Sequence, residues 1–565
     1  MKKALRNILT MILAVVFISA LSPVIPARAD ETLSPAQPSA SPFTDVPADS
    51  WALSAIQSAV SAGLMSGMGD GTFGYGKTIT RAEFVTVLCN MFGWDAAAPD
   101  TPAFSDVAAG QWFYGYVEAA ASHGVVDAGG AFGPNDPILR KDMAVMLVKA
   151  LGYDALAAQV AQTEPVPFGD VTSDAGYITV AYDIGMISGV GGGKFAPDDT
   201  AKREEAAAML TRIYGKITAN VDWLHGFYAF SSYDQKDMIT GLNSVTFGWS
   251  AMTWDELDGA VLNTTSSGGN PWCIPDSYEL IADYPHENGV NASLGVYMDD
   301  SMGLSGMLAD GQSQNDAVKE ILAEATRPYD AIGHSPYDGV TIDFEGLKGA
   351  DAKAEFTAFL SALSGGLKSL GMSLYVTVQP VTADGQYYDG YDYRAIGRLA
   401  DKVILMAHDY EPASMDGFVG TDWQKNAALT PIASVYTALR AITDPDTGVE
   451  DKGKVALALS FASVGWMIDG SGKLTSPDPV KPSADTVYAR MNQPDTVLGW
   501  SDTYMNPYMT YTTEDGSKVF LWYEDSRSVA AKLQLAKLFG VTGASVWRLG
   551  IVPDYPGWDV WTSLR

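Results

Sequence analysis

The sequence predicts a multidomain fold, in which a repetitive helical part precedes an α/β part whose strands fit a (β/α)8 barrel. Three observations support this fold class. A chain of 565 residues is too long for one hydrophobic core. Residues 41–217 contain a motif that recurs about every 60 residues. From residue 222 onward, short β-branched or aromatic runs alternate with longer amphipathic stretches, the pattern of parallel α/β proteins.

The first 29 residues read as a signal peptide. Basic residues precede an apolar run at 8–21, and Ala27-Arg28-Ala29 has the small-x-small form of a cleavage site. We therefore expect an exported mature chain with a linker over residues 30–40. No membrane span is expected after cleavage, because no other apolar stretch is long enough; an uncleaved anchor is the alternative.

Composition excludes one large class of partner. The formal net charge is −31, so the chain has no surplus of basic residues with which to bind phosphates, and no nucleic acid partner is expected. Cys89 and Cys273 fall in different predicted domains, so no intramolecular disulfide is expected. Cys89 lies in an apolar helical pattern and is predicted to be a core residue. The sequence contains no recognisable metal or nucleotide motif, and no metal or cofactor is predicted.

The repeats share one pattern over residues 41–97, 101–155 and 165–217. Each begins with a Phe-x-Asp-Val motif and continues through a helix and a Gly-rich turn into a second helix. The motifs are Phe43-Thr44-Asp45-Val46, Phe104-Ser105-Asp106-Val107 and Phe168-Gly169-Asp170-Val171. Each second helix carries an acidic residue in its first turn, which suits the helix dipole.

These units resemble the surface-layer homology repeat, of which three tandem copies are usual. The resemblance implies an all-α, pseudo-threefold helical bundle that attaches an exported protein to a secondary cell-wall polysaccharide. By position it assigns Arg81, Arg140 and Arg203 to this polymer, and a planar guanidinium suits a carboxylated sugar. The alternative is that each arginine only closes its own helix N-terminus against the neighbouring acid. The second and third units depart from the usual Thr-Arg-Ala-Glu, so the number of binding grooves stays open.

Eight strands are predicted in the second part, residues 222–565. They are the runs 226–230, 244–249, 292–298, 339–345, 373–378, 402–408, 454–460 and 544–547. Eight strands over about 340 residues fit a (β/α)8 barrel with insertions, whereas a doubly wound open sheet would lack a use for the eighth. The stretch at about 466–524, with its Pro, Gly and Tyr content, is predicted to be a small inserted α+β subdomain.

The most informative segment for function is Asp-Gly-Val-Thr-Ile-Asp-Phe-Glu at 338–345. If it is a strand, its period of two puts the apolar residues on one face and both Asp343 and Glu345 on the other. Two carboxylates so close raise at least one pKa, as a general acid working near neutral pH requires. Glu345 ends the strand, where βα units carry their chemistry. The alternative is a half-buried strand whose polar face meets solvent.

On the fourth strand of a barrel, this segment resembles the active site of glycoside hydrolase family 18, the chitinase-like family, and of its branch of spore-cortex and cell-wall glucosaminidases. The family signature Asp-x-x-Asp-x-Asp-x-Glu corresponds to Asp338, Thr341, Asp343 and Glu345, so Thr341 replaces the second acid. The resemblance implies that Glu345 protonates the glycosidic oxygen while the 2-acetamido group of the substrate attacks the anomeric carbon. Asp343 would orient that acetamido group.

The resemblance extends to two further strand ends. Met406-Ala407-His408-Asp409-Tyr410 stands where the family has Met-x-Tyr-Asp, and Trp547 would form an apolar floor under the distorted sugar. The complete assignment is Glu345, Asp343, Asp338, Thr341, His408 and Asp409 to catalysis, and Trp547, Met406, Tyr410 and Trp249 to substrate binding. As alternatives, His408 is a satisfied polar residue at a strand end and Trp547 a buried structural residue.

Two departures from the family pattern alter the expected chemistry. Thr341 cannot share charge with Asp343, although its hydroxyl can donate a hydrogen bond to that carboxylate. We interpret this neutral residue as a mark of the cell-wall branch. His408 takes the place of a tyrosine hydroxyl, and because free imidazole titrates near pH 6.5, a pH dependence is expected that a tyrosine site would lack.

The sequence therefore favours a secreted glycosidase, attached to a bacterial cell wall, that cuts β-1,4 bonds next to N-acetylglucosamine in peptidoglycan or chitin. Attachment raises the local concentration of wall glycan, which favours the producer's own peptidoglycan, but an outward-facing chitinase fits equally. The competing hypothesis is a lectin-like surface protein with an inactive barrel. Glu345 and Asp343 count against it, because binding alone does not need an acid at the cleavage point.

Overall fold

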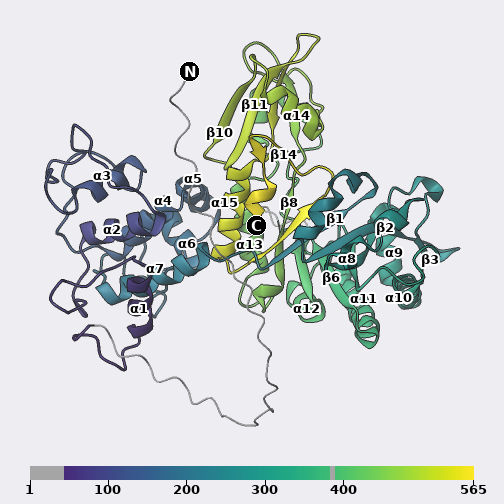
Figure 1. The fold of residues 1–565 in the computed structure, drawn as a ribbon, viewed down its shortest axis with the longest axis horizontal. Coiled ribbons are helices and arrows are strands. Elements are labelled where there is room, and N and C mark those ends of the chain that lie inside the picture. Colours follow the sequence, from purple (N-terminus) through teal and green to yellow (C-terminus); the bar gives the residue numbers. More distant parts are fainter. Residues whose placement is uncertain (1–42, 382–387, 565) are drawn as a thin grey trace, which may run out of the picture.

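A computed structural model describes residues 43–381 and 388–564. The predicted signal peptide at 1–29 and the linker at 30–40 lie outside the described residues. Figure 1 shows a helical N-terminal bundle beside a strand-rich second part, with a small sheet that rises from the latter. The observed order of elements, helices first and α/β elements afterwards, is the predicted order.

The bundle contains two helices from each repeat and one additional helix. They are α1 (Leu53–Ser61), α2 (Arg81–Phe92), α3 (Tyr114–Ser122), α4 (Arg140–Ala150), α5 (Asp154–Thr163), α6 (Ala175–Asp183) and α7 (Arg203–Ile217). The second helices bury apolar side chains, and Leu88, Leu147 and Leu210 are fully buried. At the start of α2, Thr80 and Glu83 form a capping box that satisfies two backbone N–H groups.

The three repeats contact one another in a ring. Short antiparallel bridges join the segments before the second helices: Thr80 with Pro137, Leu139 with Thr200, and Lys202 with Thr78.

The aspartate of each Phe-x-Asp-Val motif explains why the motif recurs. Asp45, Asp106 and Asp170 each accept hydrogen bonds from backbone N–H groups of the Gly-rich turn in their own repeat.

Eight parallel strands form a closed barrel, which confirms the predicted (β/α)8 fold. They are β1 (Trp223–Tyr228), β2 (Ser244–Asp255), β4 (Asn291–Met298), β5 (Gly339–Phe344), β6 (Ser373–Val378), β7 (Lys402–Leu405), β8 (Val455–Ser460) and β13 (Gly543–Trp547). The ring closes because β1 pairs with both β2 and β13. Each predicted strand overlaps an observed one, but the antiparallel extension of β2 by β3 (Gly259–Asn263) was not predicted.

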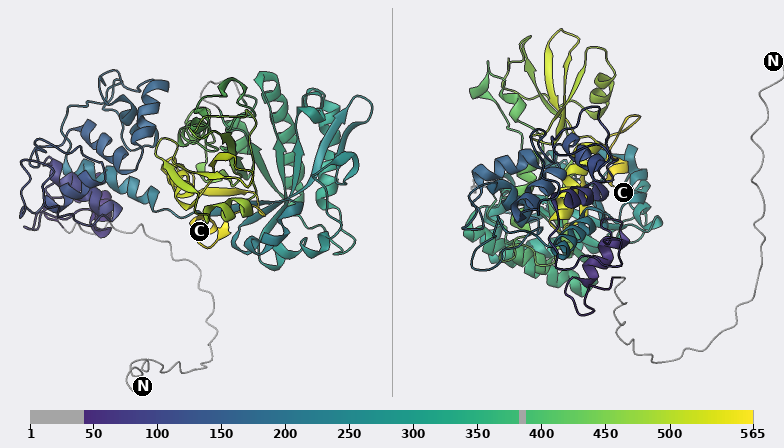
Figure 2. Two further views of the ribbon diagram at one scale, coloured as in Figure 1. Left: turned by 90° about the horizontal axis from the view of Figure 1, so that it is seen from above. Right: turned by 90° about the vertical axis from the view of Figure 1, so that its left-hand side faces the viewer.

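Helices surround the barrel, as the left view of Figure 2 shows. They are α8 (Tyr284–Glu287), α9 (Leu304–Ala309), α10 (Gly311–Thr326), α11 (Gly349–Leu370), α12 (Tyr393–Leu399), α13 (Ile432–Ile442) and α15 (Ser526–Leu538). On β5, Phe344 points outward, and its ring lies 5.3 Å from that of Phe359 on α11. Because side chains alternate along a strand, Thr341 and Asp343 point into the barrel.

A small sheet rises from the connection after β8, as the right view of Figure 2 shows. It contains antiparallel β9 (Val464–Ile468), β10 (Val497–Ser501), β11 (Asn506–Thr512) and β12 (Lys518–Trp522), with α14 (Ala484–Met491) beside it. A buried ion pair ties it to α15, because Nζ of Lys532 lies 2.5 Å from a carboxylate oxygen of Glu524. The insertion follows the carboxyl end of β8 and therefore stands on the face of the barrel that carries chemistry in this fold.

The bundle docks on the barrel through α5, α6 and α7, which lie against α13 and α15. Arg440 on α13 forms ion pairs with Glu164 and Asp183, and its Nε lies 3.0 Å from Asp183. Tyr436 donates a hydrogen bond to the same aspartate. On α7, Nζ of Lys216 donates to the carbonyl oxygen at the end of α15 at 2.5 Å. Charged and polar contacts therefore join the two bodies.

Removal of the Arg440 guanidinium is expected to weaken this docking. In Arg440→Met, Glu164 and Asp183 keep mostly buried charges with no cation beside them, which costs about 1–2 kcal/mol. Calorimetry of the whole chain should then show the bundle unfolding at a midpoint lower by about 2–4 °C per kcal/mol. The control is Arg398→Met, which removes an exposed pair with Glu450. Equal shifts in the two variants would contradict the prediction.

Three further observations concern membranes, thiols and metals. Among the described residues, no single helix is long and apolar enough to cross a membrane, and α4 with α5 would qualify only as a pair bent by 119°. Both cysteines are free, and Cys89 is buried in the core, as predicted. Within residues 43–381 and 388–564, no group of three or more His, Cys, Asp or Glu side chains could hold a metal ion.

Candidate functional site

A cavity of about 820 Å³ opens at the carboxyl ends of the barrel strands. Its walls come from the ends of β4, β5, β6, β7 and β13 and from the loops that follow them. The lining includes Tyr297, Glu345, Gln379, Met406, His408, Asp409, Tyr410 and Trp547. Residues far apart in the sequence therefore meet on the face where (β/α)8 barrels carry their active sites.

Glu345 directly follows β5, and its side chain lines the cavity. Its backbone N–H donates to the carbonyl of Met298 on β4 at 2.9 Å. The N–H of Gly346 donates to Oε1 of Gln379, after β6, at 2.6 Å. These bonds hold the chain at Glu345 between the two neighbouring strands. Its carboxyl makes no hydrogen bond or ion pair with a described residue, so both oxygens are available to a ligand.

The pKa of Glu345 is raised by burial and by three nearby carboxylates. Desolvation is the largest cause, followed by the negative charges of Asp343, Asp299 and Asp409. A glutamic acid with a raised pKa keeps its proton at a pH where an ordinary glutamate is ionised. Glu345 can therefore act as a general acid near neutral pH.

Asp343 lies inside the barrel and is 5% exposed. Its Oδ1 accepts a hydrogen bond of 2.5 Å from the hydroxyl of Thr377 on β6. Burial raises the pKa of Asp343, while the bond from Thr377 and the nearby His408 oppose that rise. The other carboxylate oxygen has no hydrogen bond to the described residues. One oxygen is thus held by a neutral donor, and the other can accept a bond from a ligand.

Thr341 belongs to a layer of hydroxyl groups inside the barrel. Its Oγ1 lies 2.7 Å from the hydroxyl oxygens of both Thr246 and Ser293. Thr246 also lies 2.7 Å from Nε2 of His225, and burial lowers the pKa of His225 to about 3, so this imidazole is neutral. The expected hydrogen bond from Thr341 to Asp343 is wrong, because a threonine on β6 supplies it. Thr341 instead joins neighbouring strands within the barrel.

Three polar atoms in the cavity wall are buried without a partner among the described residues, and one of them is Oε2 of Glu411. Nε2 of His408 and the hydroxyl of Tyr410 make no hydrogen bond to any residue that the structure describes. Nδ1 of His408 lies 2.9 Å from a carboxylate oxygen of Asp409, which fixes the ring. Although burial opposes its charge, His408 and Ser460 lower the pKa of Asp409. Because buried polar atoms are normally satisfied, these unpartnered atoms mark where polar groups of a ligand fit.

Aromatic rings form another part of the cavity wall. Trp547 ends β13 and packs against Phe227 with ring centroids 5.0 Å apart. Trp272 stacks on Tyr297 at 4.8 Å and lies 6.1 Å from Trp547. Met406 belongs to the apolar cluster that also contains Trp547. Flat apolar faces beside carboxyl groups suit a sugar ring, which has apolar C–H faces and polar edges.

Asp338 lies away from this cavity, although the sequence assigned it to catalysis. It precedes β5 and therefore stands at the opposite end of the strand from Glu345. Its carboxylate accepts hydrogen bonds from Nε2 of His286 at 2.8 Å and from the N–H of Ala292 at 2.9 Å. The assignment of Asp338 to a catalytic contact is wrong, because its position is at the amino ends of the strands.

Trp249 also lies outside the cavity, although the sequence assigned it to substrate binding. The ring is fully buried and stacks on Phe247 at 4.1 Å. The second strand does not end here, because β2 continues to Asp255. Trp249 is therefore a core residue in the middle of a strand, and the assignment is wrong.

The sequence did not predict Trp272, Tyr297 and Gln379, which line this cavity, or Asp299, which lines an adjoining cavity that also contains Glu345. Asp299 directly follows β4 and accepts a hydrogen bond of 3.1 Å from the hydroxyl of Tyr297. Gln379 directly follows β6. Their positions at the ends of predicted strands were a usable signal. Trp272 lies in an irregular loop after β3, and neither periodicity nor a motif marks it.

In the bundle, the second helix of each repeat begins with an arginine that reaches into another repeat. Each guanidinium stacks over a phenylalanine ring at 4.8–5.1 Å: Arg81 over Phe132, Arg140 over Phe195, and Arg203 over Phe73. Arg81 pairs with Asp142 at 2.6 Å, and Arg203 pairs with Glu83 at 2.8 Å. These acids belong to the other repeat, so the reading in which each arginine closes its own helix is wrong.

Arg140 differs from the other two arginines, because it forms no ion pair with a described residue. It donates instead to the carbonyl of Ser188 at 3.0 Å. The acid at the equivalent place, Glu205, accepts a hydrogen bond from the N–H of Lys202. Arg140 lines a cavity of about 250 Å³ together with Trp51, which is 66% exposed. An unpaired guanidinium and an exposed ring make this cavity suitable for an anionic sugar.

Comparison with known families divides the chain into the same two parts as the structure does, the helical bundle and the barrel. Residues 281–551 match the model of glycosyl hydrolases family 18. Residues 42–85, 103–144 and 167–207 match the model of the S-layer homology domain. The barrel and the bundle therefore correspond to two separate families.

Individual relatives resemble one part of the chain each. The chain is 26% identical to the cortical fragment-lytic enzyme of Bacillus subtilis (strain 168) over 38% of this chain and 46% of that enzyme. It is 31% identical to an S-layer protein of Bacillus thuringiensis subsp. finitimus over 34% of this chain and 24% of that protein. The solved structure of the Bacillus cereus spore cortex-lytic enzyme SleL matches with 19% identity and a TM-score of 0.47, over 61% of this chain and 74% of that one. The chain spans about half the length of the curated relatives that its barrel matches.

Proposed function

We propose that this protein, whose barrel matches the model of glycosyl hydrolases family 18 and whose bundle matches three S-layer homology domains, is a secreted glycosidase held at a bacterial cell wall. Its proposed substrates are β-1,4-linked polymers that contain N-acetylglucosamine, namely peptidoglycan or chitin. The observation that carries the proposal is the protonation and the position of the Glu345 carboxyl group. This carboxyl has a raised pKa and no described partner, and it faces a cavity walled by aromatic rings.

The proposed reaction begins with proton transfer from Glu345 to the glycosidic oxygen. As the bond between that oxygen and the anomeric carbon breaks, the carbonyl oxygen of the substrate's own 2-acetamido group bonds to the anomeric carbon. The resulting oxazolinium-type ion is then opened by water, which gives its proton to the Glu345 carboxylate. The protein supplies no covalent nucleophile on this route, so one proton donor suffices.

The other cavity residues would orient the acetamido group. The carboxylate oxygen of Asp343 that Thr377 leaves unoccupied can accept the acetamido N–H and stabilise the positive charge that develops there. Nε2 of His408 and the hydroxyl of Tyr410 offer partners to oxygen atoms of the sugar, which would satisfy both buried atoms. Trp547 would support the apolar face of the same sugar.

An inactive sugar-binding barrel is the competing function, and the electrostatics of the site count against it. A binding site gains nothing from a carboxyl group whose pKa is raised by burial and by Asp343, Asp299 and Asp409. This arrangement costs stability, since like charges are held close together. The raised pKa of Glu345 is useful only if this acid must give up a proton during a reaction.

Release of reducing ends from purified peptidoglycan and from chitin oligosaccharides tests the proposed activity. The wild-type protein should release reducing ends from at least one of the two polymers. Glu345→Gln, assayed at the same protein concentration, is the negative control. If the wild-type protein released none from either polymer, the proposed function would be wrong.

The bundle is proposed to bind an anionic polysaccharide of the cell wall. Arg140 supports this, because it lines a cavity beside an exposed tryptophan and forms no ion pair with a described carboxylate, although Glu205 lines the same cavity. Arg81 and Arg203 are already paired with acids of other repeats. We therefore propose that the cavity at Arg140 makes the larger contribution to attachment.

Arg140→Gln is expected to lower binding to cell-wall sacculi about 10-fold, because a charge-assisted contact to the polymer is lost. Co-sedimentation of the whole chain with sacculi measures this binding. Arg398→Gln, which changes an exposed arginine on α12 of the barrel, is the matched control and should bind sacculi as the wild-type protein does. Sacculi stripped of their non-peptidoglycan polysaccharide should bind the wild-type protein weakly. Undiminished binding to stripped sacculi would refute the attachment proposal.

A further inference from the structure

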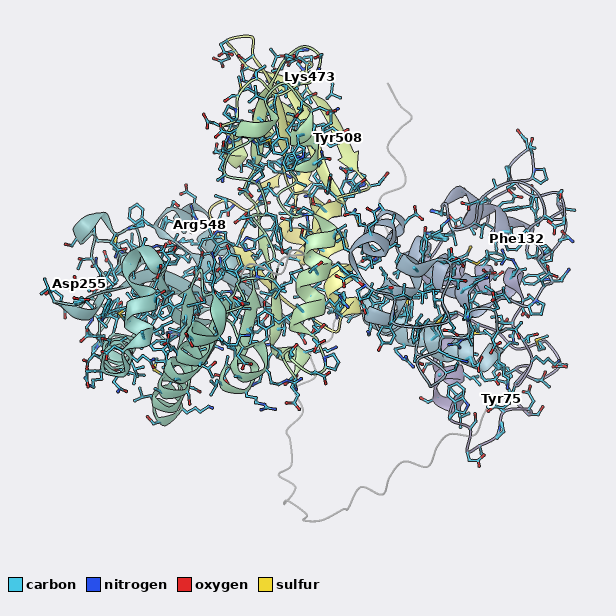
Figure 3. All side chains as sticks on the ribbon, turned by 180° about the vertical axis from the view of Figure 1, so that it is seen from behind. Tyr75, Phe132, Asp255, Lys473, Tyr508 and Arg548 are labelled. Atoms are coloured by element: carbon cyan, nitrogen blue, oxygen red, sulfur yellow. The ribbon has the colours of Figure 1, made fainter. Side chains whose placement is uncertain are left out.

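A second cavity, of about 580 Å³, adjoins the one that holds Glu345. Trp272 lines both cavities, and its ring lies 6.1 Å from that of Trp547. The other walls come from the segment after β1, which includes Phe230, and from Arg548, which directly follows β13. Figure 3 labels Arg548 on the rim of the barrel from which the inserted sheet rises. A glycan with one sugar beside Trp547 can therefore place a neighbouring sugar in this second cavity.

Arg548 brings a positive charge into this cavity and forms no ion pair with a carboxylate of residues 43–381 or 388–564. Its Nη1 donates only long hydrogen bonds, to the carbonyl of Leu549 at 3.3 Å and to the hydroxyl of Ser232 at 3.5 Å. Burial lowers the pKa of Arg548, and no neighbouring charge offsets the effect. Asp276 lines the same cavity, but within the described chain Arg548 forms no ion pair with it or with any other acid.

An unpaired, half-buried arginine is unexpected in this chain, which has 67 acidic residues and only 36 basic ones. Partial burial of a charge is unfavourable unless an opposite charge compensates it. The guanidinium plane presents parallel N–H donors that match the two oxygens of a carboxylate. The Phe230 ring, 67% exposed, and the Trp272 ring give the same cavity apolar faces of the kind that support sugars.

We propose that the cavity formed by Phe230, Trp272 and Arg548 binds a carboxylate-bearing sugar next to the sugar that is cleaved at Glu345. This inference rests on the proposed function and narrows its substrate class. Chitin is neutral along its whole length, whereas peptidoglycan carries a lactyl group on every second sugar. That group ends in a free carboxylate or is extended by a peptide with carboxylates of its own. Arg548 thus makes the protein selective for an acidic glycan.

Three sets of oligosaccharides of equal length test this selectivity: peptidoglycan fragments without peptides, the same fragments with peptides, and chitin oligosaccharides. The measured quantity is the ratio of kcat/KM on an acidic substrate to kcat/KM on the chitin oligosaccharide. Arg548→Met is expected to lower this ratio about 10-fold or more, mainly through KM, because a charge-assisted contact is removed. Arg548→Lys, which keeps the charge but not the planar pair of donors, should give an intermediate ratio. Arg527→Met removes an exposed arginine that is paired with Asp525 and serves as the matched control.

A change in the substrate gives the same test without a mutation. Conversion of the lactyl carboxylate of the peptide-free fragments to a carboxamide keeps their size and removes their charge. The wild-type protein should then lose its preference over chitin oligosaccharides, and added salt should weaken the preference for the acid form. Comparison of peptide-free and peptide-bearing fragments shows which of the two carboxylates Arg548 contacts.

Equal losses on acidic and neutral oligosaccharides in Arg548→Met would overturn the assignment of this cavity while the proposed function stood. Equal cleavage of the acid and carboxamide forms by the wild-type protein would do the same. If the wild-type protein cleaved none of the three sets, the proposed function would fail instead. In that case, calorimetric measurement of Kd for the acid and carboxamide forms would test the cavity assignment without catalysis. Equal Kd values would overturn the assignment, and tighter binding of the acid form would support it.

Discussion

Replacement of Glu345 by glutamine is expected to lower kcat by about 10²- to 10⁴-fold on any substrate that the protein cleaves, with little change in KM. Glutamine has nearly the same shape, but its amide cannot give a proton to the leaving oxygen. The chain at this position is held by backbone contacts to Met298 and Gln379, which the substitution leaves in place. Initial rates of reducing-end release at saturating substrate measure the effect.

The matched control for this substitution is Glu320→Gln. Glu320 lies on α10 and is exposed, so its replacement should leave kcat unchanged. Unfolding midpoints of the two variants should agree with that of the wild-type protein. A loss of less than about 10-fold in folded Glu345→Gln would mean that another group donates the proton.

The barrel strands could be predicted because most of them are buried on both faces. All residues of β1, β5 and β8 are buried, so these strands appear in the sequence as short, mostly apolar or β-branched runs with polar neighbours. The acids of β5 could be found for a related reason. Asp343 and Glu345 interrupt such a run with the period of two, and Glu345 stands at its carboxyl end.

The hydrogen bonds of the site could not be predicted, because they depend on the register between strands. Thr377 reaches Asp343 from a strand that lies 34 residues later in the chain. That contact follows from the pairing of β5 with β6, in which Ile342 lies opposite Val376. The pattern within β5 alone contains no information about this register, and it therefore predicts Thr341, on the same strand, as the partner of Asp343.

Strand ends were the other limit of the sequence reasoning. The sequence predicts a strand that ends at Trp249, but β2 continues to Asp255 because it pairs with β3. Trp547 lies at a true strand end and faces the cavity. Both tryptophans look alike in the sequence, and only the pairing of their strands separates a core residue from a residue of the site.

Asp343→Asn is expected to lower kcat about 10²-fold and to move the alkaline limb of the pH profile to lower pH by about one unit. The acid form of Glu345 is the active form, so activity falls as the pH rises through its pKa. The charge of Asp343 is the largest contribution to that raised pKa after burial. Asparagine keeps the shape and removes the charge, so the pKa of Glu345 falls. The dependence of kcat/KM on pH reports the shift in the free protein.

Asp299→Asn separates this electrostatic effect from the loss of the group that orients the substrate. Asp299 also raises the pKa of Glu345, but less than Asp343 does. Its replacement should therefore move the alkaline limb in the same direction by a smaller amount, and kcat should fall less than in Asp343→Asn. An alkaline limb that stayed in place in both variants would show that Glu345 does not set it. A limb that moved equally in both, with equal losses of kcat, would mean that Asp343 acts only through its charge and has no role in orienting the acetamido group.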